Sequence, residues 1–373
     1  MGSYGETLDT AQLEALLEYF FEANLRNESA TGERPTPLCI WGTHGLGKTA
    51  SVVSFARARK WKLAYCAPAQ FEEMGDLHGL PMKIDPDPTK VGDEYTAYLP
   101  PEWVPRDEGP GILLLDDINR ADDRILRGLM QLLQNFEMFS WSLPQKWQIV
   151  CTANPEGEDY SVTPMDDAML TRMLHLTLRF DVKAWASWAT SAGVDPRGID
   201  FVLTYPEVVT GKRTTPRSLV QVFAQLQGIA DWKANIGRVS ILANGGLDVS
   251  TVGALLAYIG DDLESLVSAR EILEAPTFND VKPRILAAAK GKGKTVRVDR
   301  LSAILTRLVI ALAAPEYAKP NDRVKANVVS LLKLPELPAD LRFSAHRDIA
   351  SLPEGRAALV QDAALAKLVL GTV

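Results

Sequence analysis

The segment Gly42-Thr-His-Gly-Leu-Gly-Lys48-Thr49 decides the fold of this chain, because it fits the pattern G-x-x-x-x-G-K-[ST] at each fixed position. A short apolar run, 37–41, precedes it, and a stretch with helical spacing, 49–60, follows it. Glycine reaches backbone conformations closed to other residues, so successive N–H groups can converge on a phosphate at the start of a helix. The expected nucleotide-binding residues are Gly42, Thr43, His44, Gly45, Leu46, Gly47, Lys48 and Thr49.

Two side chains of this segment are expected to act directly on a nucleotide. Lys48 would contact the β- and γ-phosphates, and Thr49 would offer its hydroxyl to Mg²⁺. A second G-K-T stretch, 291–295, lacks the first glycine of the pattern and follows helix-favouring residues rather than a strand. We interpret it as part of a solvated basic loop that holds Lys290, Lys292, Lys294, Arg297 and Arg300.

Further apolar runs alternate with stretches of helical spacing on both sides of the phosphate-binding segment. Residues 62–66, 111–116, 147–152 and 175–178 are expected strands, and residues 10–24 and 122–135 are expected helices. This alternation predicts a mostly parallel sheet with helices on both faces. We therefore expect an α/β fold, namely a P-loop αβα sandwich with a parallel five-stranded core sheet, followed by an α-helical lid and a helical C-terminal tail.

The domain organisation follows from where the strand signals fade. After residue 181, helical stretches separated by Gly and Pro dominate to the end. We expect an N-terminal helix and linker at 1–34, a nucleotide-binding αβα domain at 35–181, a helical lid at 182–275 and a helical C-terminal domain at 276–373.

An acidic pair follows the continuous apolar strand 111–115. Asp116 would hold Mg²⁺, mainly through water molecules, and Asp117 would orient an attacking water and accept its proton. The structural alternative is that these acids only cap the following helix.

Composition excludes several classes of protein. The 373 residues are 46% hydrophobic and 23% charged, which are ordinary globular values, and the formal net charge of −7 disfavours attraction of the whole surface to nucleic acid. The three cysteines match no zinc pattern and are expected to be buried thiols: Cys39, Cys66 and Cys151. Without a signal-peptide pattern or an apolar run of about 20 residues, we expect a soluble cytoplasmic protein with no membrane contact.

Five motifs follow one another between about residues 40 and 220: GTHGLGKT, LLLDDINRA, CTANP, MDDAMLTRM and TTPRSL. In these motifs and in their order, the chain resembles the AAA+ ATPases, and specifically their MoxR-like branch. By this resemblance Asn154 looks like sensor 1, Arg172 like an arginine finger that reaches a neighbour's ATP, and Arg217 like sensor 2 in the lid. Arg120 matches the family's motif at the subunit boundary. Each of these three residues also has a purely structural interpretation. Asn154 could be a turn residue, Arg172 could form a surface salt bridge, and Arg217 could be solvated at a helix end.

The chain departs from the family's pattern at two places. Asp117 stands where the family usually has Glu, so either the attacking water sits differently or the rate falls. Because a carboxylate is retained, we expect turnover rather than inactivity. The region 134–148, where the branch often carries a longer β-hairpin, is compact here. Its aromatic residues are interpreted as packing residues rather than pore contacts: Phe136, Phe139 and Trp141. In the insertion 68–110, a D-L-x-G stretch makes Asp76 and His78 candidates for substrate contact.

The resemblance implies an ATPase with ATP and Mg²⁺ as cofactors, assembled as a ring that we expect to be a hexamer. It implies that hydrolysis remodels or activates a partner protein, in the manner of a chaperone, with a von Willebrand factor A domain as a possible feature of that partner. Two alternatives stay open: a nucleic-acid motor or loader served by the basic loop, and an ATP-gated scaffold with little turnover, motivated by the short acid at position 117.

Overall fold

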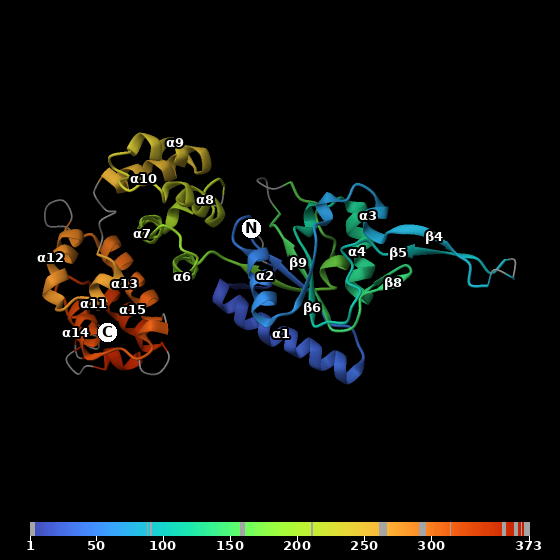
Figure 1. The fold of residues 1–373 in the computed structure, drawn as a ribbon, viewed down its shortest axis with the longest axis horizontal. Coiled ribbons are helices and arrows are strands. Elements are labelled where there is room, and N and C mark those ends of the chain that lie inside the picture. Colours follow the sequence, from blue (N-terminus) through green and yellow to red (C-terminus); the bar gives the residue numbers. More distant parts are fainter. Residues whose placement is uncertain are drawn as a thin grey trace. The chain divides into compact units, whose positions relative to one another are not determined.

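The computed structural model describes residues 4–87, 89, 92–156, 161–209, 212–260, 267–290, 296–313, 315–352, 356–361, 365, 366 and 368. The chain divides into two compact units, Met1–Asp181 and Val182–Val373. Figure 1 shows that the first unit holds the sheet and that the second is helical.

The first unit is built on a six-stranded, fully parallel sheet in the order β1-β10-β2-β9-β6-β3. The five expected strands are all present, which confirms the α/β prediction. The added strand is β1 at the edge, where Glu6 pairs with Leu176. Its three residues are largely exposed, so the sequence has no apolar run here that would predict a strand. The strands are β1 (Glu6–Leu8), β2 (Leu38–Trp41), β3 (Lys62–Cys66), β6 (Gly111–Leu115), β9 (Trp147–Ala153) and β10 (Leu174–Leu178).

Helices cover both faces of this sheet because successive strand residues point to opposite sides. In β2, Cys39 and Trp41 pack into one core with α4 (Asp123–Asn135), while Leu38 and Ile40 pack into the other with α1 and α2. The helices of the second layer are α1 (Thr10–Thr31) and α2 (Lys48–Arg59), and Figure 1 shows them across the sheet from α4. The result is an αβα sandwich.

Helix α1 is longer than the sequence pattern indicated. A capping box between Asp9 and Gln12 starts it, and Gly32, with φ of 75°, ends it. The last two turns bury the polar residues Asn24 and Glu28 instead of apolar ones, which explains why the periodic signal stopped at residue 24.

The insertion between β3 and β6 contains a short helix and an antiparallel hairpin. These are α3 (Met74–His78), β4 (Leu80–Ile84) and β5 (Tyr95–Leu99). A second, smaller hairpin joins β7 (Glu137–Met138) to β8 (Trp141–Ser142). Phe136 and Trp141 are buried, as expected for packing residues. Phe139 is 62% exposed at the hairpin turn, and its ring packs against those of His78 and Tyr98. A short helix, α5 (Asp167–Leu170), precedes β10.

The second unit contains two groups of helices in sequence. The first group is α6 (Val182–Ser191), α7 (Pro196–Thr204), α8 (Pro216–Leu226), α9 (Ile236–Gly246) and α10 (Val249–Gly260). The second group is α11 (Ala269–Glu274), α12 (Phe278–Ala289), α13 (Val298–Ala313), α14 (Asp322–Leu332) and α15 (Ala339–Ala350). Ile272 and Leu273 of α11 lie in the core formed by the later helices, ahead of the boundary expected at 275/276.

The three cysteines are free and buried, as expected. Burial raises the pKa of the Cys66 thiol to about 12. Among the residues that the structure describes, no helix combines the length and the apolar character needed to cross a bilayer.

Candidate functional site

The segment 42–49, predicted to bind phosphate, forms the loop between β2 and α2. Gly45 and Gly47 have φ angles of 77° and 94°, in the left-handed region that favours glycine, and Gly47 is the N-cap residue immediately before α2. A Cβ atom at Gly42 would lie 2.9 Å from the main-chain oxygen of Leu178. The loop is therefore closely fitted to its surroundings, with the N-terminus of a helix of twelve residues behind it.

Lys48 lies buried at the base of this loop, with 5% of its surface exposed. Its ammonium group donates to the main-chain oxygen of Gly42 at 2.7 Å and to Oδ1 of Asn154 at 3.1 Å. A buried cation held by neutral oxygens is well placed to exchange them for a phosphate oxygen.

Asp116 is fixed by three hydroxyl groups at the carboxyl end of β6. Oδ1 accepts from Oγ1 of Thr49 at 2.5 Å and from Oγ1 of Thr152 at 2.7 Å, and Oδ2 accepts from the Tyr65 hydroxyl at 3.0 Å. Burial and the neighbouring Asp116 carboxylate raise the pKa of Tyr65 to about 12, so this hydroxyl keeps its proton and donates at neutral pH.

The residues present fit a magnesium ion bound together with a nucleotide. Thr49 and Asp116 supply adjacent hard oxygen atoms, the ligand type that Mg²⁺ prefers. Within the described part of the chain, no group of three or more His, Cys, Asp or Glu side chains could hold a metal ion on its own. The remaining ligands would therefore be phosphate and water, which is how Mg²⁺ usually binds at nucleotide sites.

Asp117 turns away from the strand in a left-handed conformation, with φ of 48°. Its N–H donates to Oγ1 of Thr152 at 2.8 Å, which anchors the turn. Its carboxylate accepts from Nδ2 of Asn154 at 2.9 Å and pairs with Nε of Arg120 at 3.3 Å. An oriented carboxylate of this kind can accept a proton from a nearby water.

Asn154 is held rigidly by a second asparagine. Nδ2 of Asn119 donates to the Asn154 main-chain oxygen at 2.7 Å, and the Asn154 N–H donates to Oδ1 of Asn119 at 3.0 Å. Both residues are buried. The Asn154 side chain is thereby aimed at Lys48 and Asp117 together, which makes it the link between the phosphate loop and the acidic pair.

Three residues of this cluster escaped the sequence reasoning: Tyr65, Asn119 and Thr152. Asn119 and Thr152 lie inside motifs that were quoted, and Thr152 could have been found because it lies near the carboxyl end of β9, which pairs with the strand that precedes the acidic pair. Tyr65 carries no such signal, because its contact with Asp116 depends on the pairing of β3 with β6.

Two other predicted residues are Arg172, in the first unit, and Arg217, in the second. Arg172 follows α5, where Nε donates to Oε1 of Gln134 and a guanidinium nitrogen bonds the main-chain oxygen of Ala168. Arg217 is exposed in the first turn of α8, in the second unit. The second G-K-T stretch, 291–295, lies outside the described residues.

The two insertion candidates have local structural roles. Oδ2 of Asp76 accepts from the N–H groups of Glu72 and Glu73 at the start of α3. The His78 ring packs edge-on against the rings of Tyr98 and Phe139. His78 therefore lies at the base of the β4–β5 hairpin, beside the exposed aromatic Phe139.

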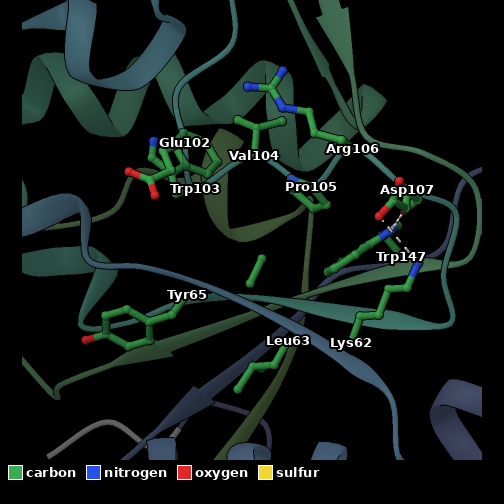
Figure 2. Close-up of a pocket in the computed structure, with 11 residues that line it drawn as sticks. Lys62, Leu63, Tyr65, Glu102, Trp103, Val104, Pro105, Arg106, Asp107 and Trp147 are labelled. Carbon is green, nitrogen blue, oxygen red and sulfur yellow. Dashed lines mark hydrogen bonds and ion pairs between the residues drawn. The ribbon is translucent and has the colours of Figure 1, made fainter.

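A pocket of about 630 Å³ lies beside the edge strand β3, away from the phosphate loop. Figure 2 shows it between β3 and the segment 102–107, with Trp103 and Trp147 among its walls. Nε1 of Trp147 donates to the main-chain oxygen of Asp107, which fixes one end of the segment. Tyr65 lines this pocket and also bonds Asp116, so it belongs to both places.

Comparisons with known proteins give a limited result. No family model matches the chain, and a search of curated proteins finds no match. Similar solved structures include RuvB, a Holliday junction branch migration motor from Thermotoga maritima, which is 14% identical over 80% of this chain and 87% of that chain, with a TM-score of 0.37. A variant of the same protein is 14% identical over 88% of this chain and 93% of that chain, with a TM-score of 0.38. At this level of similarity, function has to be argued from the site.

Proposed function

We propose that the chain is a MoxR-like AAA+ ATPase, which binds ATP with Mg²⁺ and uses hydrolysis to remodel or activate a partner protein. The proposal is carried by one observation: Lys48, Thr49, Asp116, Asp117 and Asn154 converge on the carboxyl ends of β2, β6 and β9. Ligands of open parallel sheets bind at this edge.

Each side chain then has a chemical task. The loop amides and Lys48 bind the β- and γ-phosphates, and Thr49 and Asp116 hold the hydrated cation, which neutralises charge that develops during phosphoryl transfer. Asp117 orients the attacking water and accepts its proton, while Asn154 holds the Asp117 carboxylate toward the phosphate loop.

The proposal includes a ring of identical subunits, with six as the expected number. Arg172 bonds Gln134 and Ala168 of its own chain rather than the phosphate loop, which is compatible with a guanidinium that serves a neighbour's nucleotide. Arg217, exposed at the start of α8, is proposed to sense the γ-phosphate and to couple hydrolysis to movement of the helices that follow residue 182. When hydrolysis removes a phosphate that both arginines contact, these contacts are lost. The protein then changes conformation, either by a segment becoming disordered or by a rigid-body movement.

A protein is the preferred partner because of the β4–β5 hairpin. Four large apolar side chains, each 47–69% exposed, lie on one face of it: Leu80, Met82, Tyr95 and Leu99. The cation Lys83 pairs with Glu94 at 3.2 Å. An apolar surface of this kind marks a contact with protein, whereas nucleic acid requires a cationic one. By the family resemblance, a von Willebrand factor A domain is the proposed partner type.

The basic loop gives the nucleic-acid alternative little support. Arg300 is only 9% exposed and donates to the main-chain oxygen of Ala288, and Arg297 donates to the Tyr205 hydroxyl. Two of the five cations are therefore engaged within the second unit.

The test is the variant Asp117→Asn, which removes the proton acceptor and keeps the size of the side chain. We expect ATP binding within about two-fold of the unaltered chain and turnover lower by at least about 100-fold. Calorimetry measures the first quantity and phosphate release the second. Undiminished turnover would remove Asp117 from the mechanism. ATP binding without turnover in the unaltered chain would favour the scaffold, and salt-sensitive stimulation by DNA or RNA would favour the motor.

A further inference from the structure

Tyr65 lines the pocket beside β3 and also bonds the Asp116 carboxylate. It is the fourth residue of the edge strand β3, paired in register with Leu114 of β6, and its side chain is 50% exposed. In Figure 2 its ring extends away from Trp147, with the hydroxyl at its far end. That hydroxyl donates to Oδ2 of Asp116 at 3.0 Å.

The two oxygens of the Asp116 carboxylate have different partners. Oδ1 accepts from Thr49 and Thr152, whereas Oδ2 accepts from Tyr65. The terminal torsion of an aspartate is broad and roughly two-fold, so a carboxylate held at one oxygen alone can rotate. Donors on both oxygens fix its plane. Tyr65 therefore acts on the orientation of Asp116 from the side opposite Thr49.

We propose that Tyr65 is a positioning residue for the magnesium site, which holds Oδ2 so that Oδ1 stays directed toward the Thr49 hydroxyl. The inference rests on the proposed function, because it takes a magnesium–nucleotide complex as the ligand. The aromatic ring carries the hydroxyl from the edge strand across to the end of β6, a distance that a shorter hydroxyl side chain at the same position cannot span.

The test compares Tyr65→Phe, which removes only the hydroxyl, with Tyr65→Leu, which removes the ring as well. Binding of a fluorescent ATP analogue is measured in EDTA and then across a MgCl₂ titration. In EDTA we expect both variants to bind the nucleotide like the unaltered chain, because the loop amides and Lys48 are untouched. The Mg²⁺ concentration for half-maximal effect should rise about five-fold in both, as expected for a partly exposed hydrogen bond to a charged group. Tyr19→Phe, on exposed α1 surface, is the matched control and should cause no shift.

The outcomes separate the two proposals. If Tyr65→Phe keeps the unaltered Mg²⁺ dependence and only Tyr65→Leu shifts it, the ring packs and the hydroxyl does not position Asp116, so the inference is overturned while the proposed function stands. If EDTA binding weakens in Tyr65→Phe as much as Mg²⁺-dependent binding does, the role is structural and the inference is again overturned. If the unaltered chain binds no nucleotide with or without Mg²⁺, both proposals fail.

Discussion

At the scale of single residues, the turn at Asp117 accounts for the unusual acidic pair. A residue with φ of 48° lies in the left-handed region, where Asp is tolerated better than longer side chains because it can hydrogen-bond locally. Arg120 is such a local partner, and Asn154 holds the carboxylate from the segment that follows β9. The shorter acid is thus compatible with the backbone that carries it, and the carboxylate remains oriented in spite of its lost methylene.

Thr152 supports both acids at once, and its replacement gives a direct prediction. Thr152→Val keeps the shape but removes a donor to Asp116 and an acceptor for the Asp117 N–H. We expect the free energy of unfolding to fall by about 1–2 kcal/mol and ATP turnover to fall about ten-fold. Urea unfolding and phosphate release measure these effects. Thr152→Ser retains the hydroxyl and should restore most of the turnover; equal loss in both variants would contradict the account.

At the scale of elements, the strands that position the site were predictable and the insertion was not. The run 111–115 is buried on both faces, so an unbroken apolar pattern identifies it, and 147–153 is equally buried with Gln148 and Thr152 as its polar members. The pattern also places Lys48 and Asp116 at the same edge of the sheet. Most residues of the β4–β5 hairpin are exposed, so no pattern of buried apolar residues identifies it in the sequence. The contact of Tyr65 with Asp116 depends on β3 lying next to β6 in the sheet, and the pattern of residues within a strand does not specify its neighbours.

The exposed face of the β4–β5 hairpin gives the prediction at this scale. Replacing Leu80 and Met82 by Lys should reduce the stimulation of ATP turnover by unfolded casein by at least about half, because an apolar contact surface is removed. Basal turnover should not change, and stability should change by less than about 0.5 kcal/mol per exposed site. Lys83→Ala, on the opposite face of the strand, is the control. Stimulation that survives the double substitution would exclude this face from substrate contact.

At the scale of the whole molecule, the second unit contains a buried ion pair that joins α7 to α13. Arg307 lies 2.9 Å from the carboxylate of Asp200, and both side chains are largely buried. Burial raises the pKa of Asp200 to about 7, with Asp195 adding to the rise and Arg307 opposing it. The folded unit therefore holds this proton more tightly than the unfolded chain does.

The sign of the resulting pH dependence follows from linkage. Between pH 4 and 7 the unfolded chain has already released the Asp200 proton and the folded unit has not, so the stabilising contribution is complete below about pH 4 and is lost as the pH rises through 7. We expect Asp200→Asn to flatten this slope, because the amide has no proton to release over this range. Urea unfolding at several pH values measures the slope. An unchanged slope would contradict the raised pKa.

The proposed ring gives a prediction that only an assembly can satisfy. Lys48→Ala disables the nucleotide site, and Arg172→Ala disables the finger, so each variant alone should be inactive. In an equal mixture, an Arg172→Ala subunit keeps Lys48 and can receive Arg172 from a Lys48→Ala neighbour. In a ring of head-to-tail interfaces, about a quarter of the interfaces have this arrangement, because each of the two subunits is in place about half the time. Mixed turnover near that fraction is expected. A mixture as inactive as its components would argue against an arginine that acts between subunits.

The central claim is that the loop between β2 and α2 binds the phosphates of ATP, and calorimetry tests it most directly. ATP with Mg²⁺ should bind the unaltered chain with micromolar affinity, on the order of −8 kcal/mol, and Lys48→Ala should weaken that binding at least about ten-fold, because it removes a buried charge from the phosphate site. An unaltered chain that releases no heat with ATP, or a variant that binds as tightly as its parent, would contradict the account.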